Sequence, residues 1–193
     1  MLIFSNAGEN HRSVRVGNRI TTQELATHNM EREQLAQRLQ DIRQGRLPEG
    51  EFYSTVHEFG RQHFLEARRD VEQLLKHADP EIRKIALHVL TKDWRLLEHW
   101  ETAHTFLLHD PDTDCRMQGA SALGTLKMNT RDRRTLSVLA KVVDNQQEVP
   151  IVRETAYAAM RGVLHFDPRE QFRLASKGIA TQEMDWNMVR SYL

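Results

Sequence analysis

Ten histidines are the first candidates in this sequence for metal binding or proton transfer. His99, His104 and His109 are spaced by five residues, which turns each side chain about 140° from the last on a helix. Because side chains that fan around a helix do not converge on one ion, this spacing does not predict a metal site. The sequence also has no His-Glu-x-x-His motif. We therefore expect surface or half-buried histidines, no bound metal and no cofactor.

The other chemically capable residues occur singly. The lone Cys115 excludes an intrachain disulfide and a cysteine zinc cage, and its apolar position favours a core residue over a nucleophile. "DPDTD", residues 110–114, resembles the start of a calcium loop but lacks the glycine and the distal glutamate, so a capped turn explains it better. Phosphate-binding Gly-rich loops and Gly-x-Ser-x-Gly are missing as well. The sequence thus predicts no catalytic residue and a protein that is not an enzyme.

Three similar segments predict the elements that carry these side chains. Each has an apolar residue, an arginine, a small residue three positions later and a closing apolar pair, all on one helical face. The segments are Ile82–Leu90, Cys115–Leu123 and Val152–Met160. Their arginines lie about 33 and 37 residues apart, a period typical of helix-pair solenoids. Another apolar helix precedes each segment, so we predict stacked antiparallel helix pairs whose small residues admit a close neighbour.

The text "LLKHADPEIRKIALHVL", residues 74–90, resembles a HEAT repeat of the short kind also found in phycobilisome-lyase-like proteins. The family pattern has leucines, then Asp-Pro-x-Val-Arg, then an alanine-rich run ending in Leu-Gly. The third segment matches at Val152 and Arg153. The second matches at Arg116 and Leu123, although Gly119 replaces an alanine and the turn is longer. The resemblance covers about residues 64–166 and implies an all-α superhelix.

In HEAT repeats, a turn aspartate and a helix arginine tend to form a polar ladder between repeats. The resemblance implies that the matching residues meet here, within one repeat or across neighbours. These ladder residues are Asp79, Arg83, Asp110, Arg116, Asp144 and Arg153. The same aspartates can cap the helices that follow them, and Pro150 is expected to begin the third segment's helix after a longer loop. HEAT-type di-iron hydroxylases carry several His-Glu pairs, whereas His57-Glu58 is the single pair in this sequence, so that activity is not expected.

HEAT-like DNA glycosylases supply the alternative function, a nucleic-acid binder or enzyme. "HWETAH", residues 99–104, is similar to a Trp-x-x-x-Asp stretch of that family, but His104 stands at the position of the catalytic aspartate. Trp94 and Trp100 are six residues apart and lie nearly opposite on a helix. The net charge is zero, with 27 basic and 27 acidic residues, whereas a duplex binder normally offers a basic face. Two local arginine clusters keep nucleic acid as the alternative partner.

The second helices of a helix-pair solenoid form its inner wall, so their outward positions are the candidate binding surface. The predicted strip comprises Lys84, Leu87, His88, Met117, Gln118, Ser121, Glu154, Tyr157 and Arg161. It mixes apolar side chains with single charges of both signs, which suits a protein or peptide partner better than a phosphate backbone. We therefore predict a non-enzymatic interaction module, such as an adaptor or regulatory scaffold.

Residues 21–193 are predicted to form one solenoid domain with a cap at each end, preceded by a mostly irregular arm at residues 1–20. A charged helix begins at the capping box of Thr21 and Glu24 and ends near Gly45. The apolar stripe of this helix packs either on the first repeat or on a second copy of the chain. Its residues are Leu35, Leu39 and Ile42. Monomer and homodimer both stay open.

The last residues are predicted to form a short capping helix after Asp185, with Trp186, Val189 and Leu193 on its apolar face. No apolar run approaches the roughly 18–20 residues that span a bilayer. The first residues lack the basic start and the long apolar stretch of a secretory signal. We expect no membrane contact and a cytoplasmic location.

Overall fold

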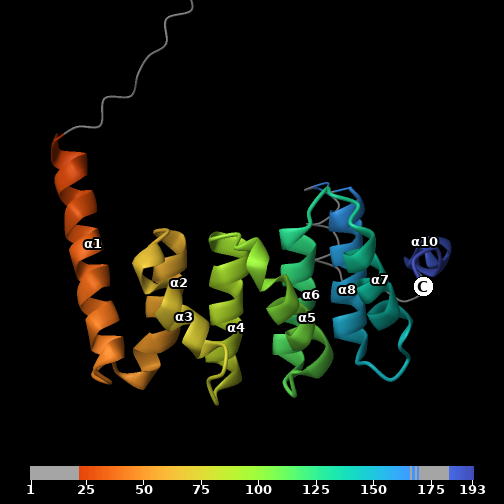
Figure 1. Ribbon diagram of the computed structural model, residues 1–193, viewed down its shortest axis with the longest axis horizontal. Helices are drawn as coiled ribbons and strands as arrows, with labels where there is room; N and C mark the ends of the chain where they lie inside the picture. The colour runs from red at the N-terminus through yellow and green to blue at the C-terminus, as the bar shows by residue number, and fades with distance from the viewer. Residues whose placement is uncertain (1–21, 166, 168, 170–182) are drawn as a thin grey trace, which may run out of the picture.

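The computed structural model describes residues 22–193 apart from 166, 168 and 170–182 (Figure 1). Within those ranges every regular element is helical, and the helices stand side by side along one long axis. The predicted all-α solenoid is therefore confirmed. The predicted arm at residues 1–20 and the capping residue Thr21 lie outside the described part of the chain.

The helices follow one another along the chain as the repeat pattern requires. The N-terminal half comprises α1 (Thr22–Arg43), η1 (Glu49–Glu51), α2 (Phe52–Arg61), η2 (Leu65–Ala67), α3 (Arg68–Leu74), α4 (Pro80–His88) and η3 (Val89–Asp93). The C-terminal half comprises η4 (Leu97–His99), α5 (Trp100–His109), α6 (Thr113–Leu126), α7 (Arg133–Asp144), α8 (Pro150–Leu164) and α10 (Trp186–Arg190). The predicted repeat segments thus lie on the second helices, the first on α4 and the start of η3, the second on α6 and the third on α8.

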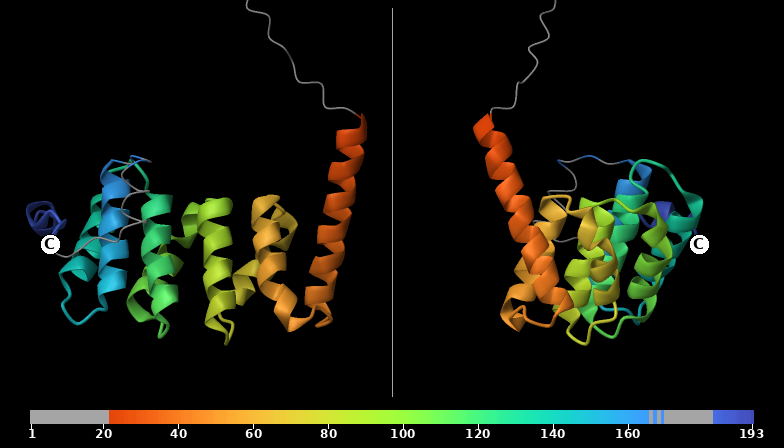
Figure 2. Two further views of the ribbon diagram at one scale, coloured as in Figure 1. Left: turned by 180° about the vertical axis from the view of Figure 1, so that it is seen from behind. Right: turned by 60° about the vertical axis from the view of Figure 1, so that its left-hand side comes forward.

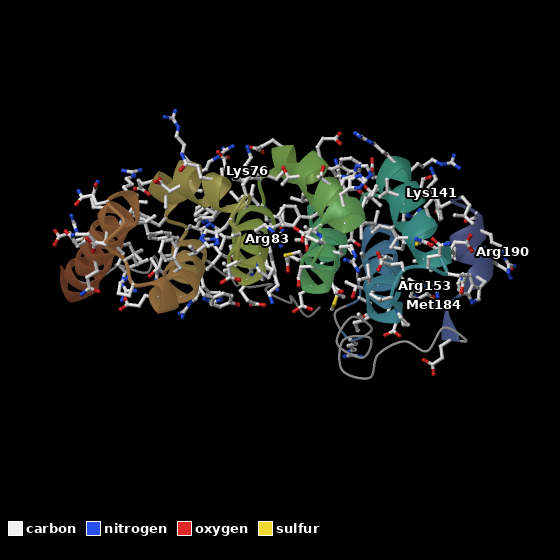
Figure 3. The ribbon with its side chains drawn as sticks, turned by 90° about the horizontal axis from the view of Figure 1, so that it is seen from below. Lys76, Arg83, Lys141, Arg153, Met184 and Arg190 are labelled. Carbon is white, nitrogen blue, oxygen red and sulfur yellow. The ribbon has the colours of Figure 1, made fainter. Side chains whose placement is uncertain are left out.

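The helices form two layers, which Figures 2 and 3 show from behind, from the side and from below. One layer contains α3, α5 and α7, and the other contains α2, α4, α6 and α8; we call the latter the second-helix layer. α6 packs against α4 and α8 within its layer and against α5 across it, while α7 packs against α8. α6 therefore has three neighbouring helices, namely α4, α5 and α8.

The turn residues set where the second helices begin. Asp79 accepts a hydrogen bond from the Glu81 N–H at 2.9 Å and caps α4, with Pro80 in the first turn. Before α6 the cap is Asp112, which accepts from the backbone N–H of Cys115 at 2.9 Å. α8 begins at Pro150 without a side-chain cap. The predicted capping role is thus confirmed for Asp79 and is wrong for Asp110 and Asp144.

Two clusters of buried apolar side chains form the core. The first joins α1 to α4 and includes Val56 and Phe59, which are fully buried. The second joins α5 to α10 and includes Leu136 and Met160, also fully buried. Each such side chain contributes roughly 1.5–3 kcal/mol when it leaves water. α4 belongs to both clusters, because its Leu87 packs in the second.

Small residues on the second helices allow close packing between helices, as the repeat pattern predicts. A Cβ atom at Gly119 would lie 2.5 Å from the backbone N of Leu107 on α5. At Gly124 it would lie 2.9 Å from Cβ of Ala159 on α8. α6 is therefore approached at contact distance from two sides, and neither glycine has room for a larger side chain.

Both ends of the described array are covered by short apolar surfaces. Leu35 and Leu39 of α1 are 4% exposed and pack in the same cluster as Val56 of α2, so this stripe packs against the chain's own α2. Gly45 ends the α1 region with φ +65°, which favours glycine. At the other end Val189 of α10 is fully buried, and Trp186 packs on the second cluster. The prediction for Leu193 is wrong: this side chain is 52% exposed.

Candidate functional site

Arg83 links the first repeat to the second. Its Nε and Nη2 donate to the two carboxylate oxygens of Asp110 at 3.0 and 2.8 Å. Its Nη1 donates to the backbone oxygens of His77 and Ala78, both at 2.9 Å. The two side chains are only 13% and 7% exposed. The ladder predicted for this position therefore runs between repeats, while Asp79 stays in its own turn as a helix cap.

Arg116 repeats this geometry one helix pair later. Its Nε and Nη2 donate to the carboxylate of Glu148 at 3.1 and 3.0 Å, and its Nη1 donates to the backbone oxygen of Asp110 at 3.1 Å. The acid in this rung is Glu148, and the prediction of Asp144 is wrong. Asp144 ends α7 and is exposed. The longer loop before α8 places a later acid, Glu148, next to the N-cap Val149, and this acid pairs with Arg116.

Arg153 occupies the third position and lacks a carboxylate. Its Nε donates to the backbone oxygen of Val143 at 2.8 Å, and the residue is 6% exposed. Its Nη2 is buried and finds no hydrogen-bond acceptor among the described residues. The predicted ion pair with Asp144 is therefore wrong, because Arg153 binds the carbonyl that precedes Asp144. Figure 3 labels Arg83 and Arg153.

The predicted binding strip is wrong at two positions. Leu87 is fully buried, and Tyr157 is 6% exposed. Both follow a ladder arginine by one helical turn and therefore face the next helix pair, as that arginine does. Leu87 packs in the second core cluster, and the Tyr157 hydroxyl accepts a hydrogen bond from the Asp185 N–H at 3.0 Å.

Four other strip residues come together in one surface depression of about 320 Å³, which we call the α4–α6–α8 hollow. It is lined by Lys84, Asp114, Met117, Gln118, Ser121 and Thr155. Lys84 Nζ lies 2.6 Å from a carboxylate oxygen of Glu81 and 3.4 Å from one of Asp114, so its ammonium joins α4 to α6. Met117 is half-buried and packs against the second core cluster. The hollow thus offers apolar, amide, hydroxyl and charged groups together.

Sequence reasoning missed two residues of the hollow. Asp114 lies one helical turn before Gln118 on α6, and Thr155 lies on α8 at the position that corresponds to Gln118 in the repeat. The i, i+4 spacing of Asp114 and Gln118 places both side chains on one helix face, and this spacing could have predicted Asp114 as part of the surface. Glu154 and Arg161, which were predicted for the strip, are half-buried on α8 and lie outside the lining.

His88 lies next to the hollow, against α2. Its Nε2 is 3.7 Å from a carboxylate oxygen of Asp93, and its ring centroid is 6.5 Å from that of His57. Burial is the main cause that lowers the pKa of His88 below its ordinary value, while the charge of Asp93 opposes that shift. His88 is therefore mostly neutral near pH 7. Within the described ranges no three metal-ligating side chains gather at a site.

The tryptophans of the glycosylase-like stretch take part in helix packing. Trp100 is 7% exposed, its Nε1 donates to Thr135 Oγ1 at 2.8 Å, and the guanidinium of Arg134 lies 3.8 Å above its ring. Trp94 is equally buried and donates to the backbone oxygen of Phe59 at 3.3 Å. Both indoles therefore have partners inside the array, and neither lines the hollow.

Cys115 is expected to resist thiol reagents. It is fully buried, its Sγ lies 3.3 Å from the Pro80 carbonyl oxygen, and burial followed by the charge of Asp110 raises its pKa to about 12. Because the thiolate is the reactive form, native protein at pH 8 should show almost no labelling by a chromogenic disulfide reagent. Urea-unfolded protein should react fully, with one thiol per chain. Fast labelling of the folded protein would contradict this placement.

Comparisons with known proteins agree with the repeat architecture. Residues 69–161 match the family described as HEAT repeats. No curated protein and no solved structure matches the chain. Over the described ranges, no helix is both long and apolar enough to cross a membrane. Since the matched range coincides with the stacked helix pairs from α3 to α8, residues 69–161 of this chain are HEAT repeats.

Proposed function

We propose that the α4–α6–α8 hollow binds a protein or peptide partner, and that the chain acts as an adaptor or regulatory scaffold and not as an enzyme. The observation that carries this proposal is the meeting of Lys84, Met117, Gln118 and Ser121 in one depression on the second-helix layer. HEAT repeats generally mediate protein–protein interactions, which supports a partner of this class.

The chemistry of the hollow suits a polypeptide segment. Met117 supplies an adaptable apolar contact. Gln118 and Ser121 can donate hydrogen bonds to a peptide backbone and accept hydrogen bonds from it. Asp114 is 60% exposed and can meet a basic side chain of the partner. Basic groups do not dominate the lining, which favours a polypeptide over a phosphate backbone.

Site-specific photo-crosslinking tests this proposal directly. A photoreactive amino acid at the exposed Ser121 should capture a discrete partner in native cells, whereas the same group at the exposed Thr105 on α5 should not. Adding Met117→Glu should weaken capture about tenfold, because it places a charge in the apolar part of the contact. The folded state of each variant is checked by circular dichroism.

Each outcome of the crosslinking decides between specific alternatives. Equal capture at Ser121 and Thr105, or capture that Met117→Glu leaves unchanged, would refute the role of the hollow. A captured species that nuclease digests would instead favour the nucleic-acid alternative. A crosslink to a second copy of the chain would show that the hollow is an interface of a homodimer.

A further inference from the structure

The ladder follows one rule in the first two rungs. Each arginine binds an acid from the turn that precedes the second helix of the next pair. Asp110 lies two residues before Asp112, the N-cap of α6, and Glu148 lies one residue before Val149, the N-cap of α8. The acid for a third rung is therefore expected just before the N-cap of the next helix in the stack.

Arg153 is in the same register but lacks this acid. The residue is 6% exposed, and its Nη2 is buried without an acceptor among the described residues. A buried guanidinium with an unmade hydrogen bond is costly, whereas a carboxylate would satisfy both its charge and its donor geometry. The position of Arg153 is therefore favourable for a carboxylate ligand.

Residues 183–185, directly before α10, lie against α8. Asp185 is the N-cap of α10, and its backbone N–H donates to the hydroxyl of Tyr157, one turn after Arg153 on α8. Met184 and Val189 are buried in the same core cluster as Tyr157. The start of α10 is thus tethered to α8 one turn from Arg153, while the body of α10 packs against α7.

We propose that Arg153 is a carboxylate-binding site and that its ligand is the side chain of Glu183. Glu183 lies two residues before the N-cap Asp185, as Asp110 lies two residues before Asp112. Two residues span at most about 7 Å, so the tether between Asp185 and Tyr157 keeps Glu183 within reach of α8. Glu183 is exposed in the structure, and the proposed pair requires its side chain to turn toward Arg153. We call this pair the Arg153–Glu183 latch. It holds residues 183–193 against Tyr157 and does not involve the α4–α6–α8 hollow.

Asp144 is the competing carboxylate and provides the matched control. It follows Val143, whose carbonyl accepts from Arg153, and it is exposed. The first rung shows how such a residue behaves. Arg83 binds the carbonyl of Ala78, just before Asp79, yet takes its carboxylate from Asp110. By this correspondence Asp144 is the equivalent of Asp79 and should not bind Arg153.

Hydrogen exchange on the full chain tests the latch. Glu183→Ala should speed exchange of the backbone amides of residues 188–190 about tenfold, since a charge-assisted contact to a buried group is lost. Arg153→Gln should have the same effect, and the double variant should exchange no faster than either single variant. Asp144→Ala should leave these amides unchanged. Additive effects, a silent Glu183→Ala, or opening by Asp144→Ala would each overturn the proposal.

Chemical rescue identifies the ligand as a carboxylate. Sodium acetate should restore slow exchange in Glu183→Ala, while sodium chloride at equal ionic strength should not. Acetate should have no effect on Arg153→Gln. Failure of acetate to rescue an opened Glu183→Ala would refute binding of a carboxylate at Arg153. The acetate experiment needs only Glu183→Ala, whose substitution is at an exposed site, so it decides the question even where Arg153→Gln does not fold.

Discussion

Replacing Asp110 with alanine is expected to lower the free energy of unfolding by about 3–5 kcal/mol, since it leaves the Arg83 guanidinium in a nearly buried site without its acid. The backbone oxygens of His77 and Ala78 would still accept from Nη1, but Nε and Nη2 would lose both partners. Urea denaturation at pH 7 measures the loss.

The effect of this substitution should depend on pH with a defined sign. Burial alone would raise the pKa of Asp110, but hydrogen bonds from Arg83 and the Asp112 N–H outweigh it, so the pKa is lowered. A carboxyl whose pKa is lower in the folded state stabilises the protein above its unfolded value, about pH 4. That stabilisation is lost as the pH falls through the lower folded value. The difference between wild type and Asp110→Ala should therefore shrink in acid.

Two matched variants separate this rung from ordinary surface charge. Asp114→Ala removes an acid that is 60% exposed and should cost less than about 1 kcal/mol. Replacing Arg83 and Asp110 together with methionine and leucine should recover most of the stability lost by the single change. A cost for Asp110→Ala as small as that for Asp114→Ala would show that the buried rung does not stabilise the array.

Gly119→Ala is expected to lower the free energy of unfolding by about 2 kcal/mol. The added Cβ would lie 2.5 Å from the Leu107 backbone N and 2.7 Å from the Ala103 backbone oxygen. Backbone atoms cannot rotate away, so α5 must shift from α6 and loosen the second core cluster. Alanine's better helix propensity, about 1 kcal/mol, offsets only part of this cost. Thermal and urea unfolding both measure the result.

Gly50→Ala is the control for the glycine substitution. A Cβ at Gly50 meets nothing within 4 Å, and the residue is exposed with an ordinary φ. This variant should be neutral or more stable by about 0.4–1 kcal/mol, because alanine restricts the unfolded chain. If Gly119→Ala were as stable as Gly50→Ala, the close approach of α5 and α6 would be refuted.

The sequence predicts the repeat register well because that register depends on local spacing. An arginine, a small residue three positions later and an apolar pair define one helical face, and Arg83 and Arg116 do occupy equivalent places. The need for a small residue at Gly119 follows from the same alignment, since it reflects contact within a helix pair. These features require no knowledge of where the next repeat lies.

Features that depend on the neighbouring repeat could not be derived from spacing. Leu87 and Tyr157 look available on a single helix but are buried, because each faces the helix pair that follows. The loop before α8 determined that Glu148, and not Asp144, meets Arg116. The π-helical turn η3 also departs from the 3.6-residue period used to read the chain. Asp93, the last residue of η3, lies against Gly60 of α2, where an added Cβ would collide with the Asp93 carboxylate.

The double membership of α4 in the two clusters has a consequence for ligand binding. Ile85 and Ala86 face the first cluster, Leu87 faces the second, and Lys84 of the same helix reaches the hollow. In stacked repeats each unit is stabilised through its immediate neighbours. A molecule that binds Lys84 therefore contacts α4, the helix that belongs to both core clusters. Its binding energy stabilises the helix pairs on either side of α4 against unfolding.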